Sequence, residues 1–127
     1  MKFPTKTDIE TLENMLTEKG NCACSAAMLF CMDKQIICTS NAMSEEDDPT
    51  AHAAIVATRL KRSEIRKNKL QCSIFLSEKP CPMCVAGIHQ AGICHLFFIE
   101  NNKIKYIDLR NNNLNNRYEE IPVVPKK

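Results

Sequence analysis

Two short motifs constrain this chain most, because each places metal-ligand residues at the start of a predicted helix. The first motif is DPTAHAAI at positions 48–55, where His52 opens a helix expected over Thr50–Lys67. The second is PCPMC at positions 80–84, where Cys81 and Cys84 open a helix expected over Pro82–Ala91. The fold must therefore bring two helix starts together if these three side chains share one ion.

The three side chains form a zinc-ligand set. Cysteines at i and i+3 share a helix face, and the positive end of the helix dipole favours the thiolate that binds metal. Structural zinc sites usually close with four protein ligands, whereas catalytic sites use three and leave one place to water. No fourth ligand is apparent beside His52, Cys81 and Cys84, so the sequence predicts an open site for one Zn²⁺. Buried thiols or a thioredoxin-like redox pair are the alternatives, which the prolines and the histidine disfavour.

Hydrophobic periodicity predicts helices that alternate with strands, which is typical of a layered α/β fold. An opening hairpin makes the central sheet mixed, with about five strands and helices on its flanks. We expect a single domain over residues 1–127. The further expected elements are a helix over Thr5–Lys19, hairpin strands over Cys24–Met32 and Ile36–Thr39 joined by a turn at Asp33-Lys34-Gln35, a polar loop over Ser44–Asp48, and strands over Gln71–Leu76, His95–Glu100, Lys103–Leu109 and Ile121–Val124.

Composition narrows the class of protein. The chain is 44% hydrophobic and 25% charged, and its net charge of +2 does not by itself indicate nucleic acid or an anionic membrane as partner. No run of 18 apolar residues predicts a membrane span, and the first ten residues lack the apolar core of a signal peptide. We therefore expect a cytoplasmic protein whose eight cysteines are metal ligands or buried thiols rather than disulfides.

The paired motifs resemble the cytidine and deoxycytidylate deaminase superfamily, whose signature is His-x-Glu followed by Pro-Cys-x-x-Cys. The resemblance is closest to guanine deaminases and tRNA adenosine deaminases. It implies a three-layer α/β/α cytidine-deaminase-like fold, with zinc on His52, Cys81 and Cys84. It also implies that a zinc-activated water adds to the ring carbon bearing an amine, which leaves as ammonia. Asn41 would hydrogen-bond the base, and the backbone N–H groups of Ala53 and Cys81 would hold the water-derived hydroxyl.

The resemblance also suggests substrate and assembly. A guanine-like free base is the favoured substrate, another purine or nucleoside comes next, and a tRNA adenosine is the alternative. A homodimer with one zinc per subunit is expected by analogy, and no membrane partner is expected. A non-catalytic zinc module that binds a nucleotide or a partner protein is the hypothesis from a different class.

One motif position departs from the family. The superfamily places a glutamate two residues after the histidine, and here that position is Ala54. The glutamate moves protons from water to the ring and the leaving amine, a role typically contributing about 10²–10⁴-fold. The sequence therefore predicts a chain that binds zinc without turnover. We favour an introduced glutamate-to-alanine change, since every other motif position is intact, over a natural pseudoenzyme.

Other cysteines and histidines invite weaker hypotheses. Cys22 with Cys24, or Cys94 with His95, could form a second metal site, but buried thiols in a sheet are favoured. The same interpretation applies to Cys31, Cys38 and Cys72, and a packed or surface position is expected for His89.

Basic residues concentrate between positions 59 and 69. We favour a solvated helix face over a tRNA-binding patch as the role of this basic stretch. Lys79, just before the second motif, is expected at the surface, although many relatives carry an acid there. The basic stretch consists of Arg59, Lys61, Arg62, Arg66, Lys67 and Lys69.

Overall fold

The structure, a computed structural model, is built around one mixed sheet and describes residues 4–19, 26–68, 71–110 and 119–121. The strand order is β2-β1-β3-β4-β5-β6, with β3 and β4 parallel and the other neighbours antiparallel. The predicted mixed sheet is confirmed, with six strands rather than about five. The elements are α1 (Lys6–Lys19), β1 (Ala26–Cys31), β2 (Lys34–Ser40), α2 (Met43–Glu46), α3 (Ala53–Leu60), α4 (Arg62–Lys67), β3 (Cys72–Leu76), α5 (Pro82–Ala91), β4 (His95–Glu100), β5 (Lys103–Asp108) and β6 (Glu119–Ile121).

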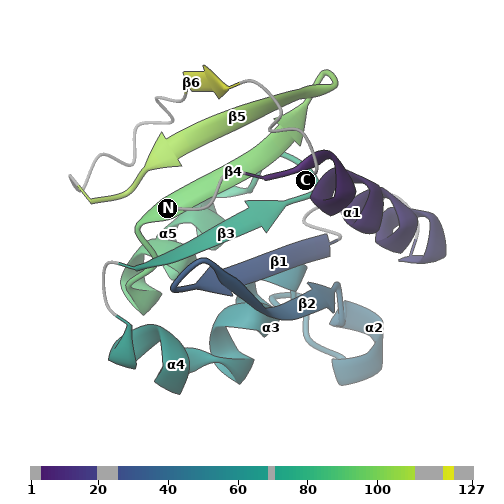
Figure 1. Cartoon of the computed structure of the whole chain (residues 1–127). Coiled ribbons are helices and arrows are strands. Elements are labelled where there is room, and N and C mark those ends of the chain that lie inside the picture. The colour runs from purple at the N-terminus through teal and green to yellow at the C-terminus, as the bar shows by residue number, and fades with distance from the viewer. Residues whose placement is uncertain (1–3, 20–25, 69–70, 111–118, 122–127) are drawn as a thin grey trace.

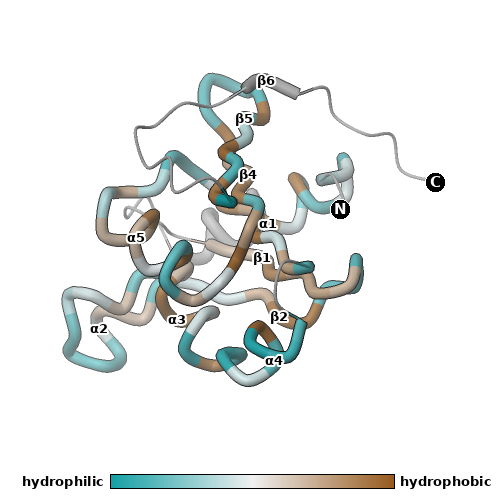
Figure 2. The backbone as a smooth tube through the Cα atoms, turned by 90° about the vertical axis from the view of Figure 1, so that its left-hand side faces the viewer, coloured by the Kyte–Doolittle hydropathy of each residue, from teal (hydrophilic) through white to brown (hydrophobic). Residues whose placement is uncertain are grey.

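Helices cover both faces of the sheet, so the predicted three-layer α/β/α fold is confirmed (Figure 1). On one face Leu12 of α1 packs with Met28, Phe75 and Phe97. On the other face α3 and α5 pack against alternate residues of the same strands, such as Leu29. This alternation follows from the two-residue period of a strand. In Figure 2 the hydrophobic segments follow the strands, whereas the segment around α2 is hydrophilic.

The first hairpin turns one residue earlier than predicted. Its turn consists of Met32 and Asp33, both with positive φ (54° and 63°), instead of Asp33-Lys34-Gln35. Two positive φ values are typical of the tight hairpin turn whose twist matches that of the flanking strands. The β4–β5 connection repeats this geometry at Asn101 and Asn102 (φ 53° and 62°).

The long helix predicted over Thr50–Lys67 is two helices. The chain leaves helical geometry at Lys61 (φ −116°, ψ 23°), which ends α3 and precedes α4. Hydrophobicity alone would place Leu60 with Ile55, Val56 and Ile65 on the buried side of this stretch, but Leu60 is 62% exposed. The alanines at 53, 54 and 57 are fully buried instead, since small side chains let α3 pack closely on its neighbours. The stretch predicted as a polar loop over Ser44–Asp48 contains most of the short helix α2.

The remaining predicted elements agree closely with the structure. Helix α5 has the predicted bounds, with Pro82 in its first turn and Gly92 in the left-handed conformation (φ 99°) at its end. Thr5 and Asp8 cap α1 reciprocally through hydrogen bonds of 2.9 and 3.2 Å. The last strand is the exception, because β6 covers Glu119–Ile121 and shares only Ile121 with the predicted Ile121–Val124 strand, whose other residues lie outside the described ones. Within the described parts of the chain, no helix is long and apolar enough to cross a membrane.

Candidate metal centre

Two helix N-termini on one face of the sheet supply the candidate ligands. His52 is the N-cap residue of α3 and Cys81 is that of α5, each with an extended backbone (ψ 153° and 164°). Cys81 is extended because the residue before a proline avoids the helical region. His52 therefore precedes its helix instead of lying in the first turn, because α3 begins at Ala53 and not at Thr50 as predicted. Neither side chain caps its own helix among the described residues, which leaves both free to bind a metal.

The three predicted ligands converge. The Nδ1 atom of His52 lies 3.6 Å from the Cys81 sulfur and 3.3 Å from the Cys84 sulfur, and all ligand atoms fall within 4.8 Å of one another. Zinc bonds of about 2.1 Å to nitrogen and 2.3 Å to sulfur, at tetrahedral angles, separate such atoms by about 3.6 Å. The donor set and its spacing therefore fit Zn²⁺. No carboxylate belongs to this group in the described portion of the chain.

A close contact between α3 and α5 positions the two helix starts. A Cβ atom on Gly87 of α5 would lie only 2.7 Å from the Cδ1 atom of Ile55 on α3. Glycine at this position leaves room for the Ile55 side chain between the two helices. This positioning residue was not singled out from the sequence, where an isolated glycine inside a helix is the available signal.

The segment before His52 is held by its own hydrogen bonds. The Asp48 carboxylate accepts from the Thr50 backbone N–H (2.9 Å), the Thr50 hydroxyl (2.7 Å) and the Arg59 guanidinium (3.3 Å). These bonds hold the pKa of Asp48 below its usual range, first through Thr50 and then through Arg59. The Ala51 carbonyl accepts from the Ala42 N–H at 2.9 Å, which ties this segment to the chain around Asn41.

Asn41 is 7% exposed and presents an unused donor. Its side-chain oxygen accepts from the Met43 N–H at 2.9 Å, whereas its buried Nδ2 atom has no hydrogen-bond partner among the described residues. A buried amide without a partner costs about 1–3 kcal/mol, so it indicates a site that a ligand completes. Asn41 follows β2 directly, and the Ala42–Ala51 bond places it beside the segment that carries His52.

Positions 53 and 54 are both buried alanines at the start of α3. The Ala53 carbonyl accepts from the Thr39 hydroxyl at 2.7 Å, which anchors this helix start to β2. The Ala53 N–H belongs to the first turn, whose N–H groups have no partner within the helix. The Ala54 methyl group can neither give nor take a proton.

The other cysteines and histidines considered as possible ligands do not form a second metal site among the described residues. Cys94 and His95 are buried and join no metal group in the described parts, and Cys22 and Cys24 lie outside them. The Nδ1 atom of His95 lies 2.7 Å from the Tyr106 hydroxyl, and burial lowers the pKa of this histidine. The other predicted positions are as follows: Cys31 and Cys72 are buried, Cys38 and His89 are half-buried, and Lys79 is exposed.

The basic stretch lies mostly at the surface. Arg59 pairs with Asp48, whereas Arg66 and Lys67 line an open hollow of about 370 Å³ together with Ser63. This hollow is on α4, which follows the C-terminal end of α3, whereas His52 lies at the N-terminal end of α3. The α4 part of the stretch therefore lies apart from the metal centre, whereas Arg59 contacts the segment before His52. Lys69 is outside the described residues.

Comparisons with known proteins agree with this geometry. Residues 9–100 match the family model of the cytidine and deoxycytidylate deaminase zinc-binding region. A tRNA-specific adenosine deaminase of Buchnera aphidicola is 31% identical over 97 residues, 75% of this chain and 60% of that protein. A guanine deaminase of Bacillus subtilis is 34% identical over 59 residues, 46% of this chain and 38% of that protein. The chain thus spans less than two thirds of the length of either relative.

Solved structures show the same likeness. The X-ray structure of guanine deaminase from Bacillus subtilis superposes with a TM-score of 0.63 at 25% identity, covering 76% of this chain and 64% of that one. A structure from a study of A-to-I editing by tRNA:A34 deaminases gives a TM-score of 0.52 at 30% identity, covering 57% of each chain. With the family match spanning most of the chain and the ligand geometry above, this chain belongs to the cytidine and deoxycytidylate deaminase family.

Proposed function

We propose that this chain is the scaffold of a zinc-dependent hydrolytic deaminase for a small purine-like base, guanine-like first, disabled by Ala54. The observation that carries the proposal is the convergence of His52, Cys81 and Cys84, with a fourth position open and a buried, unpartnered Asn41 amide near the same helix start. The scaffold is one domain over residues 1–127 with one zinc.

Each residue has a role that follows from its chemistry. His52 holds the metal through Nδ1, and the two cysteines hold it as thiolates favoured by the α5 N-terminus. When bound, zinc polarises a water and lowers its pKa to about 7. The Asn41 amide donates to an acceptor on the base, and the Ala53 and Cys81 N–H groups donate to the oxygen that attacks the ring. At position 54 the chain offers no group that moves the protons to the ring nitrogen and the leaving amine.

Charge next to the site supports a small neutral base over a polyanion. The residues that follow Asn41 include four carboxylates, at positions 45–48, in and directly after α2. Asp48 stays ionised because its hydrogen bonds lower its pKa. Negative charge at this edge repels phosphate and leaves an uncharged base unaffected.

A second candidate is deamination of a tRNA adenosine. It is favoured by the tRNA deaminase relatives and by the basic hollow on α4, where Arg66 and Lys67 would contact the phosphate backbone. A third is a natural zinc module that binds a base without turnover. The three candidate functions share the same metal centre. They differ in whether the residue at position 54 transfers protons in the parent protein and in whether the basic stretch binds RNA.

The decisive variant is Ala54→Glu, with Ala54→Gln as the matched control. Glutamine has nearly the size of glutamate but moves no proton, so it separates chemistry from packing. For the zinc-loaded Ala54→Glu protein we expect ammonia release at least about 10²–10⁴-fold above both the Gln variant and the unchanged chain. The assay uses free bases, nucleosides and a tRNA anticodon stem-loop.

Each outcome selects one candidate. Ammonia from guanine or a related base supports the first proposal, and salt-sensitive release from the stem-loop supports the second. If the Glu variant binds zinc and base and still releases no ammonia, the enzyme proposal fails and the binding module stands.

We also propose that the chain works in the cytoplasm as a homodimer. A reducing compartment keeps the described cysteines as the free thiols that zinc needs. The homodimer is proposed by analogy with the deaminase family. Light scattering of the purified chain at micromolar concentration should give twice the monomer mass of 14.4 kDa.

A further inference from the structure

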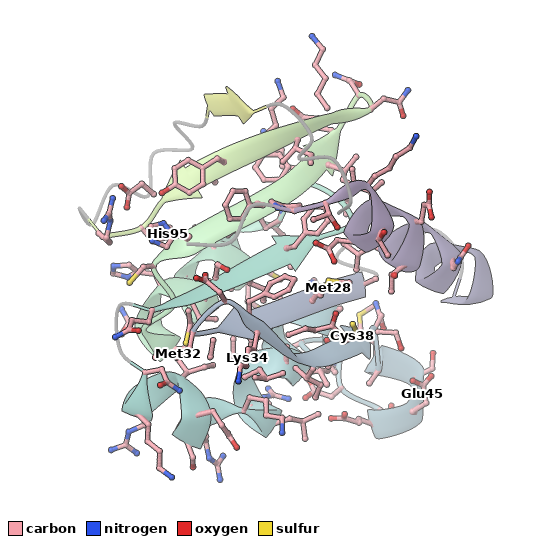
Figure 3. The ribbon with its side chains drawn as sticks, in the orientation of Figure 1. Met28, Met32, Lys34, Cys38, Glu45 and His95 are labelled. Atoms are coloured by element: carbon pink, nitrogen blue, oxygen red, sulfur yellow. The ribbon has the colours of Figure 1, made fainter. Side chains whose placement is uncertain are left out.

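Two buried cysteines face each other at the end of the sheet opposite to the metal centre. Cys31, the last residue of β1, pairs directly with Cys72, the first residue of β3. Their side chains are 4% and 1% exposed, and the Cys72 thiol donates to the Asn68 carbonyl at 3.6 Å. The length of β3, about 16 Å for five residues at 3.3 Å each, separates Cys72 from the segment that leads to Cys81. Figure 3 shows Met32, next to Cys31, at the same end of the sheet as His95 and far from Glu45.

The backbone around the pair has the spacing that a disulfide needs. The Met32 N–H donates to the Gln71 carbonyl at 3.0 Å, one residue outside the pair. In an antiparallel ladder this bond makes Cys31 and Cys72 a non-hydrogen-bonded pair, whose Cα atoms lie about 4.5 Å apart with side chains close together. Disulfides span Cα separations of about 4.4–6.8 Å. The two sulfurs can therefore join with little backbone movement.

We propose that Cys31 and Cys72 form a reversible intramolecular disulfide when the protein meets a peroxide. The thiolate of Cys31 attacks one oxygen of hydrogen peroxide, the O–O bond breaks, and a sulfenic acid forms as water leaves. The Cys72 sulfur then attacks that sulfur, the S–O bond breaks, and a second water leaves. In total, two thiols lose two protons and two electrons, and one peroxide is reduced to two waters.

The environment of the pair sets the order and pace of this reaction. Burial raises the pKa of Cys31, the neighbouring Cys72 side chain offsets part of this rise, and the charge of Glu64 adds to it. Burial, Cys31 and Cys94 together raise the pKa of Cys72 further. Cys31 is therefore the first nucleophile. Oxidation proceeds through local opening of the strand ends, next to the turn where Met32 is 55% exposed.

A third thiol in the same row supplies a matched control. Cys94 precedes β4, and its N–H donates to the Cys72 carbonyl at 3.3 Å. Its own sulfur lies 3.8 Å from the Gly92 carbonyl. The three thiols make no metal group among the described residues, where only the His52 group qualifies.

The test treats the zinc-loaded full chain with hydrogen peroxide, blocks remaining thiols by alkylation, and maps the peptides by mass spectrometry. We expect a Cys31–Cys72 cross-linked peptide two hydrogens lighter than the reduced pair, with zinc retained. Cys31→Ala and Cys72→Ala should each abolish it, whereas Cys94→Ala should keep it. A Cys81–Cys84 or Cys72–Cys94 link in place of this one, or no link at all, overturns the proposal.

Thermal unfolding provides a readout that does not depend on the variants folding well. The disulfide would close a chain segment that includes α3 and α4, which restricts the unfolded state. The oxidised chain, without any cysteine substitution, should melt several degrees higher than the reduced chain, and dithiothreitol should reverse the change. A lower or unchanged melting temperature in a sample whose link is confirmed would contradict a disulfide that fits the native geometry. Neither result depends on deaminase activity.

Discussion

Cysteines at the two ends of β3 share a residue type but not an environment. After the carboxyl end of β3, Cys81 and Cys84 lie at the start of α5, 3.6 and 3.3 Å from the Nδ1 atom of His52. At the amino end, Cys72 is 1% exposed inside the sheet and faces Cys31. The cysteines at the helix start lie beside a histidine, whereas burial raises the pKa of the sheet thiols.

The difference shows that backbone placement decides what a cysteine does in this chain. Proline on both sides of Cys81 forces an extended N-cap that directs the sulfur outward from the helix end. Strand geometry instead directs Cys31 and Cys72 into the core on one face of the sheet. Cys81 and Cys84 can therefore bind a cation, whereas Cys31 and Cys72 can pack in the core or form a disulfide.

The largest expected effect comes from removing a ligand. Cys84→Ser should lower zinc affinity at least about 100-fold, because the oxygen is a poorer ligand and two donors remain. Since zinc stabilises the folded state it binds, the melting temperature in zinc should also fall. Chelator competition and calorimetry measure both quantities.

Cys72→Ser is the matched control at the other end of β3. It should bind zinc with unchanged affinity and lose stability only through the altered core. Equal zinc loss in the two variants would contradict the assignment of different roles to the two ends.

A smaller effect is expected where α3 meets α5. Gly87→Ala places a Cβ atom 2.7 Å from the Ile55 Cδ1 atom, the far end of a flexible side chain that can turn aside at a cost of about 0.5–1.5 kcal/mol. Alanine gains about 1 kcal/mol over glycine in a helix. We therefore expect a net change in stability within about 0.5 kcal/mol with Ile55 present.

A double-mutant cycle isolates this contact. In the Ile55→Ala background the clash is absent, so Gly87→Ala should stabilise the protein by up to about 1 kcal/mol. Urea unfolding of the four proteins measures the coupling. The same effect of Gly87→Ala in both backgrounds would show that the helix approach does not depend on this glycine.

The sequence predicts the parts of this molecule that local chemistry determines. The bounds of α5 follow from Pro82 and Gly92, and the ligand set follows from the two motifs. The mixed sheet and its layers follow from the alternation of strands with helices.

Other features depend on tertiary packing and are not visible from local pattern. The break at Lys61 divides a stretch whose residues all allow helix, and Leu60 is exposed because the alanines of α3 face the core. The Cys31–Cys72 pairing requires the register of two strands distant in sequence, which no short motif specifies. The unpartnered Asn41 amide likewise appears only once its surroundings are assembled.

The smallest expected effect lies at the same end of the sheet as Cys72. Asp108 pairs across strands with His95 and receives a bidentate contact from Arg110 (2.7 and 3.0 Å), which lowers the pKa of Asp108 to about 2. Because this pKa is depressed on folding, the contribution to stability is complete above the unfolded value of about 4 and is lost as the pH falls through about 2. Asp108→Asn should therefore cost at most about 1 kcal/mol at pH 7, as expected for a partly exposed pair.

The pH dependence of that difference is the informative measurement. Urea unfolding measures the free energy of unfolding of the unchanged chain and of Asp108→Asn at the same pH values. Effects common to both proteins, such as the release of zinc in acid, cancel in the difference between them. The two curves should converge as the pH falls from about 4 to about 2. A difference that stays constant would mean that the carboxyl group of Asp108 stabilises by shape and not by charge. In that case the two ends of the sheet would differ electrostatically only in the environments of their cysteine thiols.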